Sequence, residues 1–238
     1  MAQFPPALSH GNIDEVFPNL FFVSGAMETV LQDMDWKFSR NMTVVRDGER
    51  LVIVNSVRLD DAGLAALDRL GRVTDVIRLG SLHGRDDPFY VDRYDARYWT
   101  MPGMEHETGL KATHTLTAGG PMPISDASLF EFRTTRIAEG ILRLDRADGI
   151  LIACDALQNW HQADAYFSES SRELMQQLGF FTPANLGPVW VQRATPGAED
   201  FTRLKELSFK HALCGHGEPL RDTAHEDYSA TFNRMFGI

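Results

Sequence analysis

The chain has 238 residues, enough for one large domain or two small ones with a substantial buried core. Its formal net charge is -10, from 33 acidic and 23 basic residues, which argues against nucleic acid or an anionic membrane as the main partner. Two cysteines exclude a disulfide scaffold, and no apolar run is long enough for a transmembrane helix. The first residues lack the basic and apolar regions of a signal peptide, so the sequence predicts a cytoplasmic protein.

The first half of the chain predicts strands and helices in an α/β arrangement. Asp47-Gly48-Glu49 separates two apolar stretches and is typical of a hairpin turn. Asp60 and Asp61 are expected to cap a helix that has leucines at helical spacing and ends at Gly71. The expected elements are an irregular arm over residues 1–19, strands over 20–25, 40–46 and 51–55, this helix, a strand over 74–79, a short helix over 89–94 and a strand over 97–101.

The second half begins with residues 102–128, a loop long enough to be functional rather than a mere connector. The β pattern then resumes, and no internal repeat or linker follows, so we expect a single domain over residues 1–238. The expected elements are strands over 129–134, 141–144 and 149–153, a helix over 162–178, an aromatic and Pro-rich stretch over 180–196, a helix near 199–208, a strand over 210–214 and a terminal helix through residue 236.

A polar loop, Gly80-Ser81-Leu82-His83-Gly84-Arg85-Asp86-Asp87-Pro88, follows the strand that ends at residue 79. Open α/β sheets place their chemistry at the carboxyl ends of strands, although a solvated loop is the commoner origin of such a cluster. The cluster gains weight from two later strands, which are followed by Asp155 and His216. Three strands therefore each end in residues that are able to bind a metal or move a proton.

The three loops, in this order, resemble those of the metallo-β-lactamase superfamily from about Leu20 onward. Gly149-Ile150-Leu151-Ile152-Ala153-Cys154-Asp155-Ala156-Leu157 resembles the apolar strand that ends in the family's metal-bridging Asp. Phe209-Lys210-His211-Ala212-Leu213-Cys214-Gly215-His216-Gly217-Glu218-Pro219 resembles the strand and loop that carry its last His ligand. The resemblance implies an α/β fold of four layers, an αβ/βα sandwich of two mixed β-sheets flanked by helices.

The first ligand motif of the family, His-x-His-x-Asp-His, is only half kept in this chain. His83 and Asp87 match the motif, whereas Arg85 replaces its second His and Pro88 its last. The family's middle His falls near Arg136, counting back along the chain from the second motif. A guanidinium is always cationic and does not bind metals, so a two-metal centre is not expected.

The resemblance implies that one divalent ion, zinc, iron or manganese, is held by Asp87, Asp155 and His216, with His83 as a further ligand or a general acid or base. His83 and Asp87 are the expected catalytic residues. Such a chain would be a hydrolase of a small molecule with an ester-, thioester- or amide-like carbonyl.

An alternative with no metal explains the same substitutions. Two buried carboxylates need a neutralising cation, and Arg85 can supply it through a bidentate pair with Asp87. The chain would then be a non-catalytic relative that binds a small ligand or a protein partner. Both functions stay open, as does the oligomeric state, a homo-oligomer included.

Other residues are assigned to the lining of the site or to packing. Arg85 and Arg136 are expected to line the cleft, together with Trp160 and His161, although packing is the commoner role for such a Trp-His pair. The two cysteines, at 154 and 214, are expected to be buried structural thiols, with a thiolate ligand or a redox-sensitive pair as the alternatives.

Overall fold

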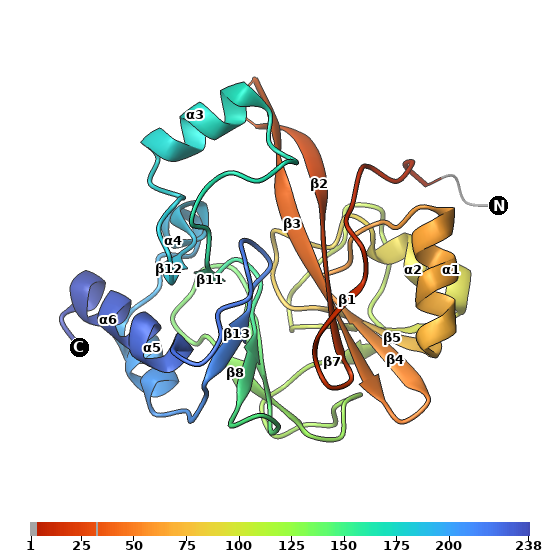
Figure 1. Cartoon of the computed structure of the whole chain (residues 1–238). Coiled ribbons are helices and arrows are strands. Elements are labelled where there is room, and N and C mark those ends of the chain that lie inside the picture. Colours follow the sequence, from red (N-terminus) through yellow and green to blue (C-terminus); the bar gives the residue numbers. More distant parts are fainter. Residues whose placement is uncertain (1–3, 32) are drawn as a thin grey trace.

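The computed structural model describes residues 4–31 and 33–238, and its elements form four layers (Figure 1). The first sheet has seven strands in the order β1 to β7, and the second has four in the order β13-β10-β9-β8. Helices α1 and α2 cover the outer face of the first sheet, and α4, α5 and α6 cover that of the second (Figure 1). The predicted αβ/βα sandwich is therefore confirmed. No helix in the described part of the chain has the length and apolar character needed to span a bilayer.

The bounds of the elements are as follows. The strands are β1 (Asp14–Phe17), β2 (Leu20–Leu31), β3 (Met34–Asp47), β4 (Arg50–Val54), β5 (Arg72–Arg78), β6 (Arg97–Thr100), β7 (His114–Thr115), β8 (Ala127–Glu131), β9 (Gly140–Leu144), β10 (Ile150–Ile152), β11 (Leu157–Gln158), β12 (Asn185–Leu186) and β13 (His211–Leu213). The helices are α1 (Asp61–Leu70), α2 (Asp87–Tyr94), α3 (Glu169–Gln177), α4 (Pro188–Ala194), α5 (Ala198–Lys205) and α6 (Ala224–Phe236).

Side chains alternate between the two faces of each strand, so most of the buried apolar residues form three cores: one between the two sheets and one between each sheet and its covering helices. In β4, Ile53 packs beneath α1 and α2, whereas its neighbour Val52 packs between the two sheets. In β10, Ile152 lies between the sheets and Leu151 packs against the helices of the opposite face. Successive side chains of a strand point to opposite faces, so apolar runs of this kind fit strands that are buried on both faces.

The structure differs from the predicted elements at a few segments. The N-terminal arm contains β1, which pairs with β2, and the β2–β3 hairpin extends beyond its apolar part into polar residues that carry no clear strand signal. The helix predicted over 162–178 begins only after Ser168, whose side chain accepts a hydrogen bond from the backbone N–H of Ser171. The aromatic and Pro-rich stretch over residues 180–196, to which no helix was assigned, contains α4, with Pro188 at its first position, where a missing N–H is tolerated.

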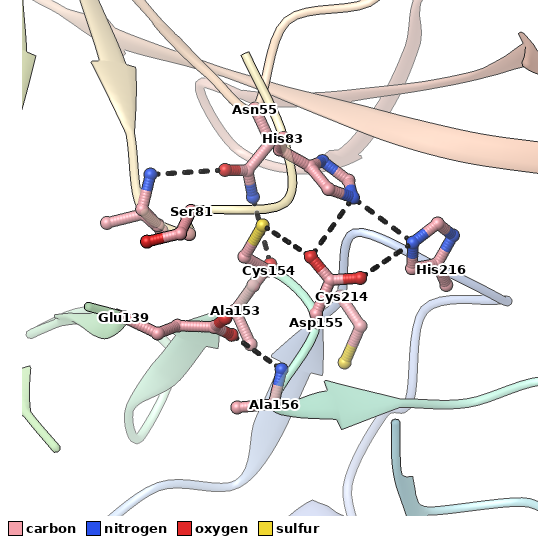
Figure 2. Close-up of polar contacts among 12 residues, drawn as sticks. Asn55, Ser81, His83, Glu139, Ala153, Cys154, Asp155, Ala156, Cys214 and His216 are labelled. Atoms are coloured by element: carbon pink, nitrogen blue, oxygen red, sulfur yellow. Dashed lines mark hydrogen bonds and ion pairs between the residues drawn. The ribbon is translucent and has the colours of Figure 1, made fainter. Parts of the chain in front are cut away.

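Parallel pairing brings the ends of distant strands to one edge of the molecule. β10 and β13 are parallel, with Ile152 opposite Leu213, so the residues that follow these strands lie side by side. The Asn55 side chain joins this edge to the first sheet: its Nδ2 donates to the carbonyl of Ala153 (3.0 Å) and its Oδ1 accepts from the N–H of Leu79 (3.4 Å). The loops after β5 and β10 are thereby held together (Figure 2).

Candidate functional site

Three of the predicted residues meet at this edge, each from the loop after a different strand (Figure 2). His83 Nε2 lies 3.1 Å from His216 Nε2 and 3.3 Å from Asp155 Oδ2. His216 Nε2 lies 3.3 Å from Asp155 Oδ1. The side chains are almost fully buried, at 6 % exposure for each histidine and 11 % for the aspartate. The fold therefore gathers His83, Asp155 and His216 into one compact cluster.

The orientation of His216 is set by a backbone carbonyl. Its Nδ1 lies 3.0 Å from the carbonyl oxygen of Ser39, in β3. A carbonyl oxygen only accepts hydrogen bonds, so Nδ1 carries a proton, and Nε2 is the nitrogen that faces Asp155 and His83. A histidine held in this way by its other ring nitrogen is typical of a metal ligand.

Burial shapes the charges within the cluster. It lowers the pKa of His83 to about 4, against the opposing effect of Asp155. Burial alone would raise the pKa of Asp155, but the neighbouring His83 and His216 outweigh it and leave this pKa lowered. At neutral pH an ionised carboxylate therefore faces the neutral imidazole of His83, an arrangement that favours a bound cation.

The donor atoms fit one metal ion. Ligands of a tetrahedral ion at about 2.0–2.1 Å lie about 3.3 Å from one another, close to the separations within the cluster. Cys154 is adjacent: its Sγ donates to Asp155 Oδ2 at 3.3 Å, and its own donor atom lies within 4.8 Å of those of His83 and Asp155. Burial raises the pKa of this thiol well above its usual range, so Cys154 acts here as a hydrogen-bond donor.

A buried glutamate supports the loop that carries Asp155. Glu139 is fully buried, and its Oε1 accepts from the backbone N–H of Ala156 at 2.5 Å (Figure 2). Burial and the charge of Asp155 raise its pKa well above the usual range. Sequence reasoning missed Glu139 and Asn55. The signal in the sequence was the position of Asn55 directly after an apolar strand, the same position that singled out the other site residues.

Asp87 lies outside the cluster. It is fully buried, and its two carboxylate oxygens accept hydrogen bonds from Ser56 Oγ (2.5 Å) and Tyr98 OH (2.8 Å). Burial raises its pKa, and these two hydrogen bonds offset the shift only in part. In the structure Asp87 thus belongs to a separate polar network, and its assignment as a ligand and catalytic residue stays a prediction.

The arginines and His161 also take up positions away from the cluster. Arg85 Nη1 donates to the carbonyl oxygen of Glu28 (2.6 Å), and over residues 4–31 and 33–238 it forms no ion pair with a carboxylate. Arg136 is exposed, and its backbone N–H is bound to Ala194. His161 is also exposed. The structure thus gives no support to an Arg85–Asp87 pair in place of a metal.

A pocket of about 640 Å³ opens above the cluster. Trp160 lines it, with its ring centre 4.9 Å from that of His216, and Arg85 is also part of the lining. The other lining residues include Met27, Glu28, Trp36, Phe38, Arg40, Arg78, His83, Glu105, Glu107, Asp155, Gln158, Met175, Phe180, Val189, Arg193 and His216. The cluster therefore has a cavity large enough for a small molecule.

These two sheets, their covering helices and the site at the strand ends make up the metallo-β-lactamase fold. The metallo-β-lactamase DIM-1, in a crystal exposed to ceftazidime, matches 96 % of this chain and 98 % of its own, with a TM-score of 0.60 and 15 % identity. A metallo-β-lactamase from Hirschia baltica matches 93 % of this chain and 97 % of its own, with a TM-score of 0.58 and 12 % identity. TMB-1 matches 97 % and 99 %, with a TM-score of 0.58 and 13 % identity. No protein-family model and no curated protein sequence matches the chain.

Proposed function

We propose that the chain is a metal-dependent hydrolase with a single ion, acting on a small molecule with an ester-, thioester- or amide-like carbonyl. One observation carries the proposal: His83, Asp155 and His216 converge beneath a pocket, with Nδ1 of His216 held by Ser39 and its Nε2 facing Asp155 at 3.3 Å. The fold of the solved metallo-β-lactamases supports the same conclusion, although fold by itself does not fix function.

His83, Asp155 and His216 would hold the ion, and zinc, iron or manganese suits two imidazoles and a carboxylate. When bound, such an ion supplies a Lewis acid and lowers the pKa of water for attack on a carbonyl. Ser39 would keep His216 in the tautomer that binds metals, and burial would keep His83 neutral. The aromatic wall beside Trp160 would exclude water from the bound substrate. We further propose that the protein is cytoplasmic and acts on a small-molecule partner, since its net charge of -10 argues against nucleic acid or an anionic membrane as the partner.

Metal analysis tests the proposal. Protein purified without chelator and dialysed against zinc, iron or manganese is expected to hold about one ion per chain. Asp155→Asn should lose the ion, whereas Asp126→Asn, a control remote in the fold and paired with Arg146, should keep it. Loaded protein is then assayed on a panel of aryl esters and thioesters. A metal content near zero for the unmodified chain contradicts the proposal.

The alternative, a non-catalytic relative that binds a ligand, is favoured by a different observation. The 3.1 Å between the two Nε2 atoms is a hydrogen-bond distance, so the cluster can satisfy itself without an ion. An arginine–carboxylate pair, Arg40 with Asp86, also lies buried nearby. The metal analysis separates the two functions, because only the hydrolase requires the ion.

A further inference from the structure

We infer that the pocket above the cluster recognises an amphipathic anion: a molecule with an aromatic or aliphatic body and a carboxylate or phosphate group remote from its reacting carbonyl. The inference rests on the proposed function for the reacting end of the ligand. The recognition of its body and its charge stands on three observations of the pocket wall.

The first observation is an apolar wall on one side of the pocket. Trp36 and Phe38 from β3, Trp160, and Met175 and Phe180 near α3 form part of a cluster that lines the pocket. Figure 1 shows α3 lying beside β2 and β3, near the end of that hairpin. Aromatic side chains of this kind bury a large area of an apolar ligand.

The second observation is a pair of arginines whose charges no carboxylate neutralises. Arg85 is held in place through Nη1 by the carbonyl of Glu28, and its Nε and Nη2 have no acceptor in the part of the chain that the structure describes. Arg193, on α4, has no hydrogen bond or ion pair to any residue within 4–31 and 33–238. By contrast, Arg40 in the same pocket is paired with Asp86. A guanidinium with free donors fits a carboxylate or a phosphate.

The acidic residues of the lining do not cancel these arginines. Glu28 is paired with Lys37, whose Nζ lies 2.8 Å from its carboxylate, and Asp155 lies between the two histidines. Glu105 and Glu107 are exposed, so water and salt screen their charges. The positive charge that remains near the pocket is that of three arginines, in a chain with a net charge of -10. The guanidinium of Arg78 is already bound to the backbone carbonyls of Gly80, Ser81 and Glu105, so of these three, within the described chain, only Arg85 and Arg193 have donors left for a ligand.

The third observation is a set of buried polar atoms without partners. Nine such side-chain atoms occur in the described part of the chain, and four belong to residues that line this pocket. Trp160 Nε1 is a donor and Gln158 Oε1 an acceptor, each buried and unsatisfied. A buried polar group without a partner is costly, and a ligand with a carbonyl and an N–H or O–H would relieve both.

Binding is measured by isothermal titration calorimetry with three probes: phenylpropionate, phenyl phosphate and the neutral phenylpropionamide. Each is titrated into protein with and without added zinc, because a carboxylate also binds metal directly. We expect at least one anion to bind metal-free protein, about tenfold more tightly than the amide, as one charged hydrogen bond implies. If one of the two anions binds more tightly, that preference shows whether the pocket selects a carboxylate or a phosphate.

Arg85→Gln and Arg193→Gln should each weaken binding of the anion about tenfold and leave the amide unchanged. The matched control is Arg172→Gln, because Arg172 is exposed on α3, where it pairs with Glu169, and lies outside the pocket lining. Equal affinity for anion and amide, or equal loss in the control, would overturn the inference. Anion binding that requires zinc and is unchanged in both arginine variants would also overturn the inference, although it would support the metal site. If instead the anion binds through the arginines and the protein binds no metal, the inference holds and the proposed hydrolase is wrong.

Discussion

Ser39 fixes the imidazole of His216 by accepting a hydrogen bond from Nδ1 at 3.0 Å, across 177 positions of sequence. The contact joins β3 of the first sheet to the loop after β13 of the second. It determines which nitrogen of His216 is free, and so what the cluster can bind.

His216→Asn should therefore abolish metal binding. The amide of Asn is a poor ligand for zinc and cannot reproduce the reach of Nε2. Metal content should fall from about one ion per chain to less than about a tenth, and the rise in Tm on adding zinc should disappear. His161→Asn is the control, because His161 is exposed and outside the pocket lining. Unchanged metal content in His216→Asn would remove this residue from the site.

Asp87→Asn tests whether Asp87 binds the metal, as the sequence predicted, or serves only the separate polar network that the structure shows. The carboxylate is bound by Ser56 and Tyr98 rather than by the cluster, so the variant should keep its metal. Its unfolding free energy, measured in urea, should change by about 1–3 kcal/mol, as expected when a buried hydrogen-bond partner is altered. If metal content falls as far as in Asp155→Asn, Asp87 is a ligand after all, and its loop must rearrange on binding.

His83 should make the stability of the metal-free protein depend on pH. Its pKa is lowered to about 4 in the folded chain, against about 6.5 unfolded, so the unfolded state binds a proton first. The contribution is fully present above about pH 6.5 and is lost as the pH falls towards 4; the shift corresponds to about 3 kcal/mol. In His83→Gln, after chelator treatment, the unfolding free energy measured in urea should depend less on pH between about pH 7 and pH 5. The same slope in both proteins would contradict this assignment.

Asn55→Ala should loosen the junction between the sheets. The substitution removes the hydrogen bonds to Ala153 and Leu79 and leaves both backbone groups buried. We expect a loss of about 2 kcal/mol of unfolding free energy together with weaker metal binding. Asn19→Ala is the control: Asn19 is exposed, binds Arg46 and has a positive φ of 63°, close to the 55° of Asn55. It therefore measures the cost of placing Ala in this backbone conformation and should leave metal affinity unchanged. A loss of stability with unaltered metal affinity would show that Asn55 does not position the site.

Local signals in the sequence predicted many of the elements, whereas the αβ/βα sandwich was predicted from the resemblance of the three loops. The hairpin at Gly48 and the cap at Asp60 both appear as predicted, and the apolar runs mark the strands. Asp155 and His216 could be placed together because both follow buried strands that pair in parallel. The position of Asp87 could not be predicted, because it depends on Ser56 and Tyr98, which are distant in sequence and carry no motif. The Glu28 carbonyl that binds Arg85 is likewise visible only in the folded chain.

Because each sheet is formed by one half of the chain, the cluster lies where the two halves meet. All strands of the first sheet precede those of the second, with β7 ending at Thr115 and β8 beginning at Ala127. His83 comes from the first half and Asp155 with His216 from the second, so an ion bound between them would tie two consecutive halves together. Removing it should speed hydrogen exchange at the facing ends of β5 and β10 before any effect on the outer helices. The site would then hold the two halves in alignment as well as bind the substrate.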